Sequence, residues 1–121
     1  MAIGRESTAA NIKPLDGAIV RRYTAGAAIA AGEIVSMSSD GYIDPAIGTG
    51  VVLSGGIALQ AAASGDRLDV VTYGPVNCVT GGTPAAVAHA SDTAGEPAES
   101  AGSNAGIVGY VESATVLFVR P

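Results

Sequence analysis

The chain has 121 residues, enough for one domain with one core, and its net charge of −5 disfavours nucleic acid and anionic membranes as partners. A single cysteine excludes an intrachain disulfide, and four Tyr and one Phe without Trp supply little surface for stacking bases or sugars. Ile and Val together number 22 against 5 Leu, and with 17 Gly and 6 Pro they favour short strands joined by tight turns.

Residues 1–16 (MAIGRESTAANIKPLD) are small and polar, with two isolated apolar residues, Ile3 and Ile12. Pro14 favours an extended conformation before it, and nothing in this stretch can form a core of its own. Two interpretations stay open: a disordered terminus, or an arm that becomes ordered against a partner. The stretch has no long apolar region, so we expect neither a signal peptide nor a membrane span, and synthesis in a cytoplasm.

The middle of the chain reads as short strands separated by glycine-rich turns. Asp40-Gly41 is a strong hairpin signal, whereas Gly74-Pro75 is expected to break a strand. Expected strands span 17–23, 32–37, 42–43, 67–73 and 76–79, with two more on either side of a Gly-Gly break within 50–60.

Residues 84–106 are rich in Ala, Ser, Gly, Asp and Glu, and Val87 is their only bulky aliphatic residue. We therefore expect a long surface loop, which in a compact domain is usually functional or mobile. Two closing strands are expected over 107–111 and 115–119. The predicted fold is an all-β single domain over 17–121, a small β-barrel or β-sandwich with an extended N-terminal arm and a long polar loop.

Catalytic patterns are missing. His89, the only histidine, lies between alanines in the polar loop and is expected to be exposed, while Cys78 lies among valines and is expected to be buried and inert. No Cys/His cluster suits zinc, and no phosphate-binding glycine loop is followed by a lysine. The carboxylates of Asp40, Asp44, Asp66 and Asp69 are expected to be solvated turn residues. The basic doublet Arg21-Arg22 is expected to form an exposed face or a salt bridge to an acidic partner. We expect no enzyme and no cofactor or metal.

Four segments nevertheless resemble a known family. Residues 23–35 (YTAGAAIAAGEIV), 56–70 (GIALQAAASGDRLDV, followed by Gly74), 106–111 (GIVGYV) and 116–120 (VLFVR) are similar to segments of the decoration (cement) proteins on tailed-phage capsids. The resemblance covers residues 17–121 in outline, and it consists of hydrophobic and glycine patterns. The loop at 91–105 and the long N-terminal arm depart from the family pattern.

The resemblance implies a β-rich homotrimer on the outer surface of the virion, bound to the major capsid protein and stabilising the expanded shell. In this hypothesis the arm adds to the capsid surface through Ile3, Arg5, Ile12 and Lys13, by extended-strand pairing. Deleting residues 1–13 would then weaken capsid binding and leave the fold intact. Two alternatives stay open: another virion part, such as a tail or head-fibre base domain, and a hydrolase or carbohydrate-binding module.

Overall fold

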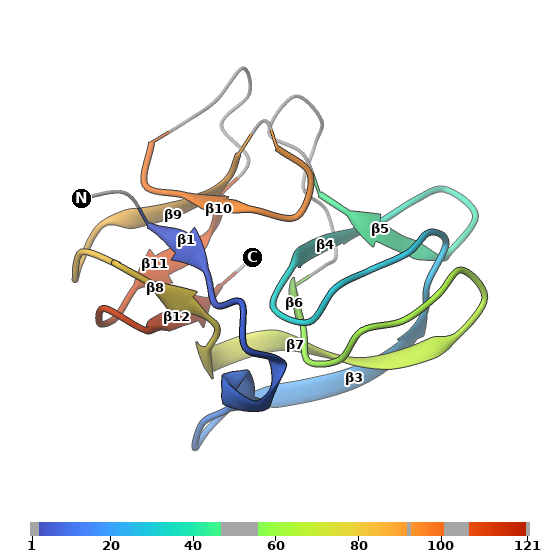
Figure 1. The fold of residues 1–121 in the computed structure, drawn as a ribbon, viewed down its shortest axis with the longest axis horizontal. Helices are drawn as coiled ribbons and strands as arrows, with labels where there is room; N and C mark the ends of the chain where they lie inside the picture. Colours follow the sequence, from blue (N-terminus) through green and yellow to red (C-terminus); the bar gives the residue numbers. More distant parts are fainter. Residues whose placement is uncertain (1–2, 47–55, 92, 101–106, 121) are drawn as a thin grey trace.

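The computed structural model describes residues 3–46, 56–91, 93–100 and 107–120, and its regular structure is almost entirely β, as predicted (Figure 1). Its elements are β1 (Gly4–Arg5), the 3-10 turn η1 (Ala9–Asn11), β2 (Lys13–Pro14), β3 (Ile19–Thr24), β4 (Ile34–Met37), β5 (Ile43–Pro45), β6 (Gly56–Ala58), β7 (Arg67–Asn77), β8 (Val79–Thr80), β9 (Val87–Ala90), β10 (Pro97–Ala98), β11 (Ile107–Val111) and β12 (Val116–Val119).

Strand β7 organises the main sheet, whose order is β10-β9-β11-β12-β7-β6-β4-β5 with antiparallel neighbours. Residues 70–71 of β7 pair with both β3 and β6, and residues 76–77 pair with both β2 and β12. The sheet therefore divides along β7 into two groups of strands, β6-β4-β5 and β12-β11-β9-β10. Figure 1 shows β7 and β3 running side by side beneath both groups.

The two groups meet again at the turn between β9 and β10. The Ile34 amide of β4 donates to the Gly95 carbonyl at 2.9 Å, and the Gly95 amide donates to the Ala46 carbonyl at 2.7 Å. These bonds satisfy backbone groups that would otherwise lie unpaired at the ends of the sheet. The sheet thus curls into a half-barrel whose two ends are hydrogen-bonded through this turn.

Among the described residues, the buried core consists of aliphatic side chains and Cys78, and Tyr23 packs against it as a partly buried residue. Neighbours in sequence on β4 and β7, such as Ile34 and Val35 or Val70 and Val71, belong to two different buried clusters. Successive side chains of a strand point to opposite faces, so both faces of this part of the sheet are covered. The larger cluster lies within the half-barrel, and the segment after β3 covers the smaller one with Ala25 and Ile29.

Residues 3–14, which we call the N-terminal strap, pack on the rest of the chain. Strand β1 pairs with β8, β2 pairs with β7, and Ile12, only 7% exposed, belongs to the larger cluster. Residues 3–14 are thus ordered against their own chain, whereas we expected either a disordered terminus or an arm that becomes ordered against a partner. Sequence reasoning missed this because two isolated aliphatic residues cannot build a core but can complete an existing one.

The expected break at Gly74-Pro75 is also wrong, since β7 continues through both residues. Gly74 has a φ of +106°, and a Cβ there would lie 2.7 Å from the Ala18 Cα. Glycine is needed here both for its backbone conformation and for this close approach. Pro75 has no amide hydrogen to place, and its carbonyl accepts the Leu15 amide at 3.0 Å.

The region 84–106 is only partly the irregular loop that composition predicted. It contains β9 and β10, and Ala88 and Ala90 are fully buried. Alanine has a low strand propensity, yet it fits where a strand packs closely on the core. The hairpin turn at Asp40-Gly41 and the two closing strands are confirmed. Residues 101–106, and 50–55 of the expected glycine-split strands, lie outside the described residues.

Candidate functional site: an aromatic outer face

The four residues predicted to contact a partner do not form one surface. Ile12 is buried, and Ile3 packs against the same core cluster. The Arg5 guanidinium donates to Glu96 at 2.8 Å and to the Ala31 carbonyl at 3.0 Å. Lys13 alone among the four is exposed. The strap therefore packs on the rest of the fold, and Ile12 is not available to a partner.

The aromatic residues lie outside the fully buried core, which is unusual for their type. Aromatic side chains normally dominate protein cores because of their large area. None of the five in this chain belongs to either buried cluster. Three of them, Tyr73, Tyr110 and Phe118, contact one another on the outer side of the half-barrel.

Strand alternation places Phe118 on this side. Its neighbours Leu117 and Val119 are buried in the core, so Phe118 points outward. Tyr110 lies opposite Phe118 in register, and their rings stack with centroids 5.1 Å apart and planes 14° apart. Tyr73 meets Phe118 edge-on at 5.3 Å and 81°.

Aliphatic residues extend the aromatic group in both directions. Ile19 pairs with Tyr73 across β3 and β7, and Val87 pairs with Tyr110 across β9 and β11. We call this set the outer row: Ile19, Tyr73, Phe118, Tyr110 and Val87. It crosses five strands. Ile19, Tyr73 and Val87 are 54%, 43% and 45% exposed, so the row is an open apolar strip.

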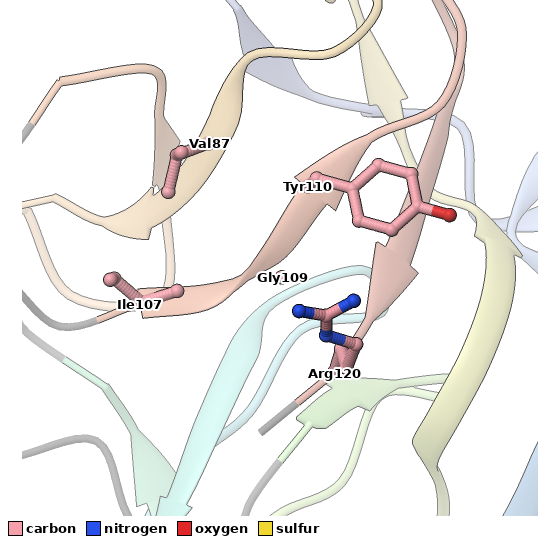
Figure 2. A pocket seen from close by; sticks show the side chains of 5 residues that line it. All are labelled: Val87, Ile107, Gly109, Tyr110 and Arg120. Atoms are coloured by element: carbon pink, nitrogen blue, oxygen red, sulfur yellow. The ribbon is translucent and has the colours of Figure 1, made fainter.

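A shallow pocket of about 280 Å³ lies at one end of the outer row (Figure 2). Val87, Ile107 and Tyr110 give it apolar walls, and Gly109 and Arg120 complete its lining. Figure 2 shows the Arg120 guanidinium directed toward Gly109, between Ile107 and Tyr110. The pocket therefore combines apolar walls with one positive charge, which suits an apolar group that carries or neighbours an anion.

The nucleophile and base candidates are not assembled into a reactive group. Cys78 is fully buried, as predicted, and burial raises the pKa of its thiol to about 12, although a hydrogen bond with the Leu117 backbone opposes this shift. His89 is half-buried on β9, so the expectation of an exposed loop histidine is wrong. It pairs with Ile107 across the sheet, and its Nδ1 atom has no hydrogen-bond partner among the described residues.

The candidate carboxylates serve local structure. Asp40 accepts the Tyr42 amide at 2.9 Å, Asp66 accepts the Ala63 amide at 3.3 Å, and Asp69 pairs with Arg22 at 3.0 Å. Within the described ranges, no group of three or more His, Cys, Asp or Glu side chains could hold a metal ion. Over the same residues, no helix has the length and apolarity needed to cross a membrane.

Sequence reasoning missed the outer row because all residues of the two closing strands are apolar or glycine. Both faces of such a strand read as buried, so alternation alone cannot say which face meets the core. One signal was present: Leu117 and Val119 alternate with Phe118, and the chain has only five aromatic residues.

Comparison with known families and proteins gives no independent indication of function, since no family model matches the chain and no curated protein matches it.

Proposed function

We propose that this protein is a non-enzymatic structural protein of the decoration type, which binds the major capsid protein on the outer surface of a tailed-phage shell and stabilises the expanded shell. The observation that carries the proposal is the outer row, a strip of partly to well exposed aromatic and aliphatic side chains on a chain whose fully buried core has no aromatic residue. Exposed apolar strips of this kind mark surfaces that another molecule covers. The four segment similarities supply the identity of that partner.

In this proposal the half-barrel is a rigid scaffold that presents the outer row to the shell. Each copy adds weak contacts between neighbouring capsid proteins, and symmetric repetition makes the sum strong. Assembly into a homotrimer would link three such contacts, so that binding at one capsid site raises the effective concentration at the next. The protein would be made in the host cytoplasm and would join the virion there.

Two other functions make different predictions. A tail or head-fibre base domain would use the same kind of surface at another place on the virion. A carbohydrate-binding module is favoured by one specific feature, the three aromatic rings on one sheet face, since such rings can stack on sugars. However, Tyr110 and Phe118 already stack on each other, which occupies one face of each ring.

The direct test is binding of the purified protein to expanded capsids that lack it, taken from the virus that encodes it. Co-sedimentation should show saturable binding, and treated shells should withstand heating better than untreated ones. Binding to tails alone would favour the base-domain alternative. Absence of binding to any particle, with retention on an insoluble polysaccharide, would favour the carbohydrate alternative. A mass measurement in solution gives the oligomeric state before assembly.

A further inference from the structure

Exposed apolar side chains are concentrated around the outer row. Seven large hydrophobic side chains are exposed among the described residues, and Tyr42 is the only one remote from the row. The other six lie on strands that carry the row or on the segment leading into β3: Leu15, Ile19, Val20, Tyr73, Val87 and Ile107. Scattered exposed aliphatics need no explanation, but the concentration of six on or next to the strands of one row marks this part of the sheet.

Charge on the same strands is biased toward cations. The five strands that carry the row, β3, β7, β9, β11 and β12, contain one of the eleven carboxylates of the chain, Asp69, and Arg22 already neutralises it at 3.0 Å. Arg21 and Arg67 lie on these strands, and Arg120 directly follows β12 at the edge of the pocket. Two exposed carboxylates flank the strands, Asp66 directly before β7 and Glu112 directly after β11, and neither lines the pocket. No carboxylate of the described residues pairs with Arg120.

This distribution selects the kind of partner. Two copies meeting through their pockets would bring two Arg120 guanidinium groups close together, which is unfavourable once water is excluded. A partner surface that presents an apolar side chain next to an Asp or Glu side chain would fill the apolar walls and pair with the guanidinium of the pocket. Its carboxylate would form a charge-assisted hydrogen bond with the Arg120 guanidinium.

We infer that the outer row and the pocket, and not the N-terminal strap, form the docking surface. The protein partner inserts an apolar side chain between the pocket walls and places a carboxylate against Arg120. This inference rests on the proposed function, because the partner is taken to be the major capsid protein. It also replaces the earlier hypothesis of contacts through Ile3, Arg5 and Ile12.

The test compares five variants on the same expanded capsids, one of them the conservative substitution Arg120→Lys. Ile107→Ser removes an apolar wall and Arg120→Glu reverses the charge at the pocket. Both side chains are exposed, so both proteins should fold and melt like the wild type. Tyr42→Ala is the matched control for an exposed hydrophobic residue remote from the row, and Lys13→Glu is the matched control for a charge reversal on the strap.

The inference predicts that Ile107→Ser and Arg120→Glu each weaken binding by about tenfold or more. Arg120→Lys should recover part of the loss, and both controls should bind within about twofold of the wild type. If the wild type binds while both pocket variants bind equally well, the inference is wrong and the proposed function stands. If Lys13→Glu weakens binding as much as Arg120→Glu does, general electrostatic attraction explains the effect and the pocket does not.

A different result would show that the proposed function itself is wrong. If the wild type binds no capsid at any concentration tested, the proposed function falls and the inference falls with it. Retention of the wild type on insoluble cell-wall polysaccharide, lost in Tyr110→Ala, would instead assign the face to sugar and overturn the inference. Circular dichroism and thermal melting of each variant identify any loss of binding that is caused by unfolding.

Discussion

Tyr110 and Phe118 stack on the outside of the half-barrel, directly above core residues of the same two strands. The rings are 5.1 Å apart, while Val111 and Leu117, which pair in the same register one step along, are fully buried. Each of these strands thus carries an aliphatic core face and an aromatic outer face. The stack is placed where it can serve a partner, with little role in filling the core.

This arrangement predicts that truncating a side chain on the core face costs more folding stability than truncating one on the outer face. Leu117→Ala should lower the free energy of unfolding by about 3 kcal/mol, because it leaves a cavity in the core. Phe118→Ala, on the other face, should cost less, about 2 kcal/mol, because it loses two aromatic pairs that are each typically worth about 1 kcal/mol. Urea denaturation measures both. Equal costs for the two variants would mean that Phe118 is part of the core, contrary to its described position.

The N-terminal strap should matter for stability. Ile12→Ala is expected to cost about 2–4 kcal/mol because Ile12 is 7% exposed in the larger cluster. Arg5→Ala should cost about 1 kcal/mol, since its ion pair with Glu96 is partly exposed to solvent. Deletion of residues 1–13 removes both and should lower Tm by more than about 10 °C. A truncated protein that melts like the full chain would show that the strap does not stabilise the fold.

Cys78 should make stability fall at high pH. Its thiol is neutral when protonated, and burial raises its pKa from 9.0 to about 12. Its contribution is therefore complete below pH 9 and is lost as pH rises from 9 to 12, at a rate on the order of 1 kcal/mol per pH unit. Cys78→Ala should flatten this slope, measured as the difference between the two proteins across pH 8 to 11. The native thiol should also resist alkylation at pH 8, where unfolded protein reacts.

Gly56 should tolerate no side chain. A Cβ at this position would overlap the Val71 carbonyl oxygen, and the Thr72 Cα lies 3.2 Å away, so β6 and β7 would have to separate. We expect Gly56→Ala to cost about 3 kcal/mol or more. Gly4→Ala is the matched control, because its Cβ would meet only the Thr80 hydroxyl at 3.7 Å. The control should remain within about 0.5 kcal/mol of the wild type; a similar loss in both variants would contradict the steric explanation.

The fold class could be predicted from the sequence because it depends on local features. The excess of β-branched residues and the Asp40-Gly41 turn both act over a few residues. The errors arose where long-range packing overrides local signals. Gly74 does not end β7, and its positive φ and missing side chain admit the close approach of Ala18, just before β3. Ile12 enters the core of elements far along the sequence.

The candidate site was harder to predict than the fold. The prediction of contacts through Arg5 and Lys13 rests on the resemblance to proteins that use such an arm, whereas Tyr110 and Phe118 sit within strands whose sequence is apolar on both faces. Which face meets the core is decided by strand pairing between distant segments, such as β12 with β7. Only the three-dimensional arrangement brings Tyr73, Tyr110 and Phe118 together.

The central claim, that the outer row is the docking face, is tested most directly by a cryo-electron microscopy reconstruction of capsids decorated with this protein. The proposal predicts that β9, β11 and β12 face the shell, with Tyr110 and Ile107 covered and a capsid carboxylate near Arg120. A reconstruction in which these strands face solvent, while the β4–β5 hairpin contacts the shell, would contradict it.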